Sequence, residues 1–285
     1  MQQGQILRSR YQIIKFLGSG GFGETHLAQD VDLPGNPKCV VKHLKPKSLE
    51  PEVLDEAKKL FEREAETLYK LGKDSNQIPK LFAHFREERE FFLVQEYIEG
   101  QDISHELTPG KKLSESETIA LVKGILEALT VAHKKNIIHR DIKPQNFMIK
   151  DGDIYLIDFG LALFYKDEHD VHIEHKDENS IVGTPKYTSF FNHNGEPQSR
   201  RDDLISLGYM YLFLTSGSLP WDYVHQMEYK TDLPEISLNH PKNVLRYEKK
   251  EFNNIRQHCD DNLSKYLDYC YSLNYNSDPN YEKLM

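Results

Sequence analysis

The sequence has few cysteines, no long hydrophobic run and no excess of positive charge, and each shortage excludes a class of protein. Its three cysteines, Cys39, Cys259 and Cys270, are too scattered for a disulfide framework or a zinc knuckle. A reducing compartment is the simpler expectation. Because the N-terminal residues lack a basic start followed by an apolar stretch, no secretory signal is expected, and the expected location is cytoplasmic.

Charge and hydrophobicity exclude two further classes of partner. The chain has 36 Lys and Arg against 45 Asp and Glu, a formal net charge of −9, whereas sequence-independent nucleic-acid binding usually needs a basic face. The most apolar segment, residues 204–214, is too short to cross a bilayer. We therefore expect neither a nucleic acid nor a membrane as partner. With 38% hydrophobic residues the chain can still build a sizeable core.

Two parts of different texture are present. Residues 6–98 mix short strand-like runs with one strong helical pattern, and residues 112–285 contain longer helical patterns. Alternating and β-branched runs predict strands at 11–17, 25–29, 38–43 and 91–95. Apolar spacings of three and four predict helices at 52–71 and 114–133, the second opened by a capping box from Ser114 to Glu117.

A glycine-rich motif stands near the start of the chain. Gly18, Gly20 and Gly23 fit the pattern G-x-G-x-x-G. A dinucleotide-binding fingerprint needs a helix after the glycines, but residues 24–28 are strand-like, which favours a flap over a mononucleotide's phosphates. An ordinary hairpin turn is the alternative for this motif taken alone.

A lysine and a glutamate follow in positions that suggest a pair. Lys42 ends an apolar strand, and Glu64 lies among Phe61, Ala65 and Leu68 on the apolar face of the 52–71 helix. A buried carboxylate needs a partner, because an unpaired buried charge costs several kcal/mol. Lys42 is the natural candidate, and a rim position for Glu64 is the alternative.

The strongest signal is a polar loop between two apolar runs. Residues 139–146, His-Arg-Asp-Ile-Lys-Pro-Gln-Asn, gather the carboxylate of Asp141, the ammonium of Lys143 and the amide of Asn146. Asp158 adds a second carboxylate at the end of the next strand. Divalent cations prefer such oxygen ligands, and phosphoryl transfer needs a metal, a hydroxyl-orienting carboxylate and a lysine.

With these motifs in this order, the chain resembles a eukaryotic-type protein kinase over nearly its whole length. The resemblance implies an α+β bilobal fold, with a small β-rich lobe at 1–98 and a larger helical lobe at 99–285 meeting at an ATP cleft. It implies ATP and Mg²⁺ as cofactors and proteins as substrates. Lys143-Pro144-Gln145 matches the serine/threonine kinases rather than the tyrosine kinases.

The resemblance also implies the role of each catalytic residue. Lys42 contacts the α- and β-phosphates and pairs with Glu64, Asp141 is the catalytic carboxylate, and Lys143 steadies the γ-phosphate. Asn146 and Asp158 are the implied magnesium ligands. The other implied contacts to ATP are the glycine loop over the phosphates, the gatekeeper, and two hinge backbones at adenine, namely Gly18, Gly20, Gly23, Gln95, Glu96 and Ile98.

The two halves resemble different relatives. Residues 6 to about 160 look like bacterial serine/threonine kinases, and from Gly183 onward the chain is similar to the casein kinase 1 group. The second likeness rests on residues 183–187, 198–204, 206–209 and 217–221. Lys186 stands where that group has an arginine that helps bind an anion, so acidic or phosphate-primed substrates are one expectation. A monomer is expected.

The leading hypothesis is an active ATP-dependent serine/threonine protein kinase. A pseudokinase serving as a nucleotide-binding scaffold is the main alternative, and a small-molecule phosphotransferase is a weaker one. Asp203 is expected to anchor the catalytic loop through its backbone. Candidate phosphorylation sites in the segment after Asp158 are Ser180, Thr184, Thr188 and Ser189.

Overall fold

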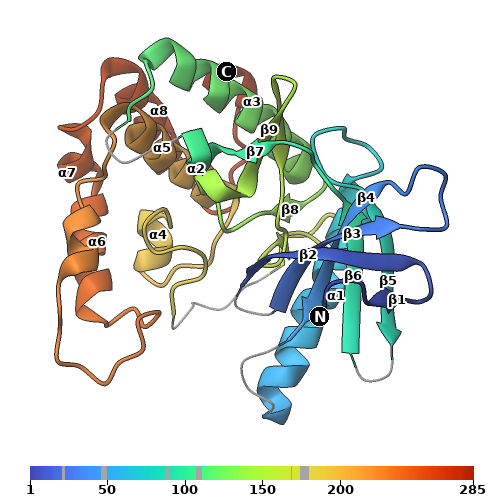
Figure 1. Ribbon diagram of the computed structural model, residues 1–285. Coiled ribbons are helices and arrows are strands. Elements are labelled where there is room, and N and C mark those ends of the chain that lie inside the picture. The colour runs from blue at the N-terminus through green and yellow to red at the C-terminus, as the bar shows by residue number, and fades with distance from the viewer. Residues whose placement is uncertain (21–22, 46–49, 88–89, 107–110, 168, 174–179) are drawn as a thin grey trace. The chain divides into compact units, whose positions relative to one another are not determined.

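The computed structural model describes the chain except for residues 21–22, 46–49, 88–89, 107–110, 168 and 174–179 (Figure 1). It divides into two compact units, Met1–Gly100 and Gln101–Met285. The first unit is a β-sheet with one helix, and the second is mainly helical. This is the α+β class that the sequence predicted.

The first unit is built on an antiparallel sheet with the strand order β1-β2-β3-β4-β6-β5. Its strands are β1 (Ile6–Leu7), β2 (Tyr11–Ser19), β3 (Gly23–Asp30), β4 (Lys38–Leu44), β5 (Leu81–Glu87) and β6 (Glu90–Glu96). The four strands predicted from the sequence are all present. β1 and β5 are additions that the sequence analysis did not predict.

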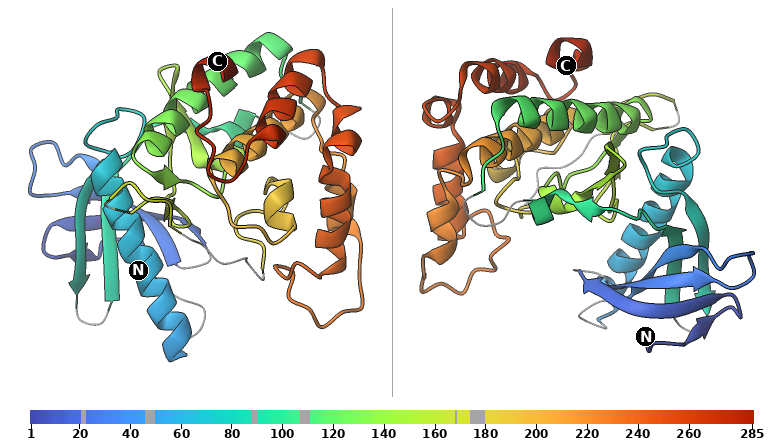
Figure 2. Two further views of the ribbon diagram at one scale, coloured as in Figure 1. Left: turned by 180° about the vertical axis from the view of Figure 1, so that it is seen from behind. Right: turned by 45° about the horizontal axis from the view of Figure 1, so that its top comes forward.

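Opposite faces of this sheet are covered in different ways. One face holds an apolar cluster formed by Leu7, Tyr11, Ile13, Ala28, Cys39, Val41, Phe85, Phe92 and Val94. The helix α1 (Pro51–Leu71) runs alongside the sheet (Figure 2), and Phe61 packs against the His84 ring at 5.6 Å. Because side chains alternate along a strand, Lys42 points away from its neighbour Val41 and toward α1.

The second unit contains the helices α2 (Ile103–Glu106), α3 (Glu115–Lys134), α4 (Phe190–His193), α5 (Arg200–Ser216), α6 (Pro241–Lys250), α7 (Phe252–Arg256), α8 (Asp261–Ser272) and α9 (Tyr281–Leu284). Its short strands form two small sheets, β7 (Gln101–Asp102), β9 (Phe147–Lys150) and β10 (Asp153–Leu156) in one, β8 (Ile137–Ile138) and β11 (Leu163–Phe164) in the other. Within the described residues, no helix is long and apolar enough to span a membrane.

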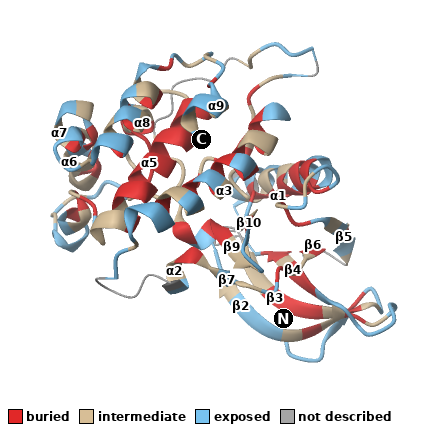
Figure 3. Ribbon diagram, turned by 90° about the horizontal axis from the view of Figure 1, so that it is seen from above, coloured by how far each residue is buried: buried red, intermediate tan, exposed pale blue. Residues whose placement is uncertain are grey.

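The centre of the second unit is α5, which is buried along most of its length (Figure 3). A helix that is covered on all sides needs apolar residues all round, and Leu204, Ile205 and Leu207 are each 0% exposed. The neighbouring helix α3 begins with the predicted capping box. There Ser114 accepts the Glu117 N–H at 3.3 Å, and the Glu117 carboxylate accepts the Ser114 N–H at 2.8 Å.

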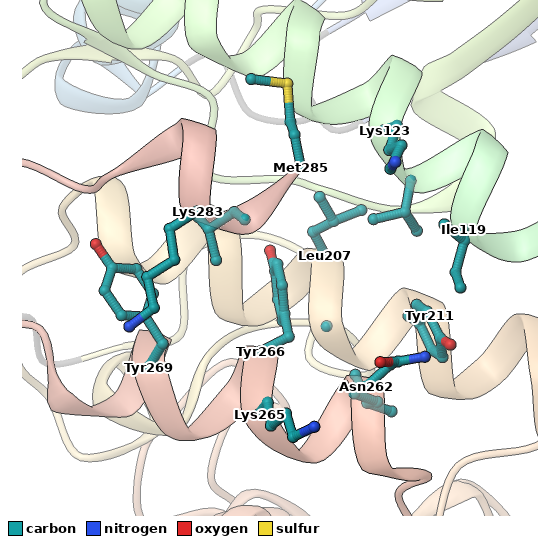
Figure 4. Close-up of a pocket in the computed structure, with 14 residues that line it drawn as sticks. Ile119, Lys123, Leu207, Tyr211, Asn262, Lys265, Tyr266, Tyr269, Lys283 and Met285 are labelled. Carbon is teal, nitrogen blue, oxygen red and sulfur yellow. The ribbon is translucent and has the colours of Figure 1, made fainter.

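A cavity of about 420 Å³ lies among α3, α5, α8 and α9 (Figure 4). Its lining includes Tyr211, Tyr266, Leu207, Lys123 and Met285. None of its lining residues is one to which the sequence analysis assigned a catalytic or nucleotide-binding role. The cavity is therefore distinct from the candidate site described next.

Candidate active site

In the first unit, Lys42 on β4 and Glu64 on α1 form an ion pair. Glu64 is only 5% exposed, and the apolar residues Ala57, Phe61 and Leu68 of the same helix are buried beside it. The carboxylate of Glu64 is thus matched by an ammonium, as burial requires. The structure brings together the two residues that the sequence suggested as partners, and it holds the Lys42 side chain in one direction.

The glycine-rich motif connects β2 and β3. Gly20 donates its N–H to the Gly23 carbonyl at 2.9 Å, and residues 21–22 lie outside the described part. A Cβ atom on Gly23 would stand 2.1 Å from the carbonyl oxygen of His43 on β4. Strands β3 and β4 approach each other here more closely than any other residue type permits.

The segment expected to meet adenine lies at the end of β6. Gln95 pairs with Val40 of β4, is 5% exposed, and has a side-chain oxygen with no partner in the described part of the chain. Glu96 donates its N–H to the Lys80 carbonyl at 2.9 Å. Ile98 is buried, and its carbonyl accepts the Gly100 N–H at 2.9 Å.

In the second unit, Asp141 is the centre of a dense set of hydrogen bonds. Its Oδ2 accepts from Lys143 Nζ at 2.5 Å, and its Oδ1 accepts from Thr184 Oγ1 at 2.7 Å and from the Thr184 N–H at 3.0 Å. Asn146 donates its amide to the Asp141 carbonyl at 2.7 Å and to Oδ2 at 3.2 Å. The carboxylate is 7% exposed and held in a single orientation.

The loop that carries Asp141 is fastened to α5 by Asp203. This carboxylate accepts the backbone N–H groups of His139 at 2.7 Å and Arg140 at 2.8 Å, and it contacts His133 Nε2 at 2.9 Å. Burial alone would raise the pKa of Asp203, but the hydrogen bonds from His133 and the His139 backbone outweigh it and lower the pKa. The geometry matches the anchoring expected of Asp203.

Asn146 and Asp158 lie on neighbouring parts of the same loop system. The Ile157 N–H donates to the Asn146 carbonyl at 2.9 Å, and Asp158 follows with a left-handed backbone at φ 64°. Because Asn146 uses its NH₂ group on Asp141, its side-chain oxygen is left for a cation. The described residues contain no cluster of three or more His, Cys, Asp or Glu that could hold a metal. One carboxylate and one amide suit Mg²⁺ when phosphates complete its shell.

Thr184 is a site residue whose role the sequence analysis missed. The sequence offers it as a phosphorylation site and as part of the 183–187 motif, but the structure shows that its hydroxyl bonds Asp141 and lies 3.2 Å from Lys143 Nζ. Gly183, at φ 96°, makes this approach possible, because a Cβ there would stand 2.4 Å from the Arg140 carbonyl oxygen. The Gly-Thr-Pro sequence at 183–185 was the signal available.

Two other candidate phosphorylation sites are covered. Thr188 is 3% exposed and donates its hydroxyl to the Thr184 carbonyl at 3.1 Å. Ser189 is fully buried, donates to Asp202 and caps α4. In this conformation neither hydroxyl is accessible to a modifying enzyme.

Lys186, the expected anion-binding position, is already paired. Its Nζ lies 3.0 Å from the Asp222 carboxylate and 4.0 Å from the centre of the Phe213 ring. The side chain of Lys186 is 32% exposed, so an incoming anion could reach it only in competition with Asp222.

Comparison with known proteins places these features in one family. The family model described as "Protein kinase domain" matches residues 11–285. The chain is 41% identical over 219 residues to the serine/threonine-protein kinase PknA of Nostoc sp., an alignment that covers 76% of this chain and 38% of that protein. It is 41% identical over 224 residues to the serine/threonine-protein kinase C of Synechocystis sp., covering 76% and 41%. The chain thus spans about two fifths of the length of these relatives.

Proposed function

Because the chain belongs to the protein kinase domain family, we propose that it transfers the γ-phosphate of ATP to serine and threonine hydroxyls of proteins. The observation that carries the proposal is the set of contacts at Asp141. A carboxylate that is fixed by Thr184, Lys143 and Asn146 can orient a hydroxyl and receive its proton. The serine/threonine class is the one named in the relatives.

The remaining groups fit ATP and Mg²⁺. When bound, Mg²⁺ would neutralise phosphate charge, and the Asn146 side-chain oxygen and the Asp158 carboxylate would hold it. Lys42, kept in place by Glu64, would contact the α- and β-phosphates. A Cβ on Gly18 or Gly20 would meet no atom within 4 Å, so phosphates have room to approach that backbone.

The two compact units would act as the small and large lobes of one catalytic domain. Gln95, Glu96 and Ile98 would form the adenine-binding segment, and Gly23 would complete the phosphate flap. Lys143 would offset charge on the transferred phosphoryl group, since its ammonium already lies beside Asp141. The pseudokinase alternative has no observation in its favour, because Lys42, Asp141 and Asp158 are all present.

The casein kinase 1-like subtype and a monomeric state remain part of the proposal. For substrate choice, the Lys186–Asp222 pair argues that any preference for acidic or primed substrates is modest. We expect an upstream phosphoserine to raise kcat/KM for a peptide by less than about tenfold, which corresponds to one surface-type ion pair. Matched peptides with serine, glutamate or phosphoserine upstream measure this directly.

The decisive experiment is transfer of label from [γ-³²P]ATP to casein, followed by phosphoamino-acid analysis. We expect phosphoserine or phosphothreonine from the wild type and none above background from Asp158→Ala. Asp153→Ala, an exposed position on the preceding strand β10, is the matched control and should keep full activity. Full activity in Asp158→Ala, or no transfer by the wild type with several protein substrates, would overturn the proposed function.

A further inference from the structure

A lysine with no exposed surface ends helix α6. Lys250 is 0% exposed, and within the described residues it forms no ion pair with a carboxylate. Its Nζ instead donates to the backbone carbonyl of Pro185, at 2.9 Å, and to that of Thr188. Lysines are rarely buried, because removing the ammonium group from water costs free energy. A lysine buried against two backbone carbonyl groups therefore suggests a structural role.

Aromatic residues contact both the side-chain nitrogen and the backbone carbonyl of Lys250. The centres of the Trp221 and Tyr209 rings lie 4.9 Å and 5.1 Å from its Nζ. The Tyr271 hydroxyl donates to the Lys250 carbonyl at 2.5 Å. Burial, with a smaller contribution from the positive charge of Arg246, lowers the pKa of Lys250 far below its usual value. A neutral amine still has two N–H groups, which equals the number of carbonyls it serves.

Most carbonyl groups of the segment 184–189 accept hydrogen bonds that do not belong to the backbone ladder of a helix or strand. The Thr184 carbonyl accepts from the Tyr187 and Thr188 N–H groups, and the Lys186 carbonyl accepts from Trp221 Nε1 at 2.8 Å. Lys250 donates to the carbonyl groups of Pro185 and Thr188, which both belong to this turn. A buried carbonyl without a partner is strongly unfavourable, so without Lys250 the turn would have to open.

This turn determines where Thr184 stands. Pro185, whose carbonyl Lys250 holds, is covalently joined to Thr184, whose hydroxyl and N–H both bond Asp141. A shift of the turn would therefore lengthen both hydrogen bonds to the Asp141 carboxylate. Displacements of about 1 Å at such positions are enough to slow a positioned reaction strongly.

We propose that Lys250 is a positioning residue for phosphoryl transfer, holding residues 184–188 so that Thr184 keeps Asp141 oriented toward the substrate hydroxyl. The inference rests on the proposed function for its catalytic part. Its structural part, that Lys250 holds this turn, stands independently of whether the chain phosphorylates proteins. Lys250 does not itself contact the reacting groups, and it acts through the turn and Thr184.

The test compares Lys250→Met with Lys249→Met. Methionine keeps the length of the side chain but cannot donate, and Lys249 is the exposed neighbour on the same helix. In Lys250→Met we expect kcat/KM for a peptide substrate to fall at least about tenfold, the effect of one lost hydrogen bond of ordinary strength. The KM for ATP should stay within about twofold, and Lys249→Met should match the wild type. In a Thr184→Ala background the effect of Lys250→Met should largely disappear.

Hydrogen exchange measured by mass spectrometry gives a second readout that needs no activity. The amides of Tyr187 and Thr188 bond within the turn, so peptides covering 180–189 should exchange at least about tenfold faster in Lys250→Met. Peptides from α5 should be unchanged. If exchange in the turn equals that of Lys249→Met, or if α5 loses protection equally, Lys250 does not position the turn and the proposal is wrong. If exchange changes but the wild type transfers no phosphate, only the proposed function has failed.

Discussion

Two lysine–carboxylate pairs, one in each unit of the molecule, are organised in opposite ways. In Lys42–Glu64 the carboxylate sits on an apolar helix face, and the lysine is the partner we propose for ATP. In Lys143–Asp141 the carboxylate is the reactive group, and it also accepts two hydrogen bonds from Thr184. In the first pair the lysine is therefore the functional group, and in the second pair it is the carboxylate, because the surroundings of the two pairs differ.

The two pairs also differ in what holds the carboxylate in place. Glu64 sits on a helix whose own backbone hydrogen bonds fix it, and its ion pair with Lys42 directs the lysine side chain. Asp141 stands in a loop, and loops need side-chain partners to hold a defined shape. Asp203, Asn146 and Thr184 supply them. The second pair should consequently be sensitive to residues that never touch the substrate.

The largest effect is expected from Asp141→Asn. Asparagine keeps the shape of the side chain but removes the negative charge and one acceptor, so kcat should fall about 10³-fold or more. Steady-state transfer from radiolabelled ATP measures this. The unfolding midpoint in urea should change little, because the loop anchors on Asp203 are untouched. Activity within tenfold of the wild type would mean that Asp141 is not the reactive carboxylate.

The residues just compared show what a sequence can and cannot reveal here. Glu64 was recognisable because a charge in a helix's apolar stripe breaks a local pattern. Lys250 was not, because a lysine at the end of an amphipathic helix usually lies in water, and its partners at Pro185 and Thr188 are distant in the chain. The contact of Thr184 with Asp141 was missed for the same reason, since it spans 43 residues.

The strands and helices of the fold show the same contrast between what the local sequence reveals and what it does not. The strands at 11–17 and 38–43 and the helix at 52–71 were predicted, because each has a clear period of its own. β5 was missed because the apolar Phe82 lies on its exposed face and Phe85 on its buried face, so hydrophobic and polar residues do not alternate. The pairing of β5 with β6 supplies the order that the local pattern lacks. Local periodicity in the sequence predicted these strands and this helix, but β5 depends on its pairing with a neighbouring strand in the folded sheet.

The second largest effect is expected from Asp203→Asn, which tests the scaffold of the Asp141 loop. The amide would point an N–H group at a backbone donor, and the buried contact with His133 would lose its charge. We expect a loss of about 3 kcal/mol in the free energy of unfolding, measured by urea denaturation, because a buried charged network is broken. Asp232→Asn, an exposed aspartate of the same unit, is the control. Equal stability of the two variants would show that Asp203 does not anchor the loop.

Glu64→Gln should have a smaller effect and tests the pair in the first unit. Glutamine keeps an oxygen near Lys42 but removes the charge, which costs about 1.5–3 kcal/mol for a hydrogen bond to a charged group. We expect kcat/KM for ATP to fall roughly 10- to 100-fold, with KM for a peptide nearly unchanged. Glu66→Gln, an exposed position on the same helix, should behave like the wild type. If peptide KM changes as much as ATP KM, the pair does not serve the nucleotide.

The smallest effect concerns His193, which lies in α4 directly after the turn that carries Thr184. Its Nδ1 donates to the Ser189 carbonyl at 3.0 Å, and burial, followed by the charge of Lys250, lowers its pKa well below 6.5. Below about pH 6.5, His193 therefore binds a proton in the unfolded chain but not readily in the folded protein. Stability contributed by His193 is present above that pH and is lost as the pH falls. Between pH 7.5 and 5.5 the loss should be about 1.4 kcal/mol.

Comparison with His193→Gln isolates this contribution. Asp202, which burial gives a pKa of about 6, changes stability in the opposite direction over a neighbouring pH range, but it is present in both proteins and cancels. Urea unfolding of the two proteins at pH 7.5 and 5.5 should show the wild type losing about 1.4 kcal/mol more than the variant. Parallel losses would mean that His193 becomes protonated without unfolding. The folded turn beside Asp141 would then tolerate an added charge, and the contrast between the two pairs would be weaker than their contacts indicate.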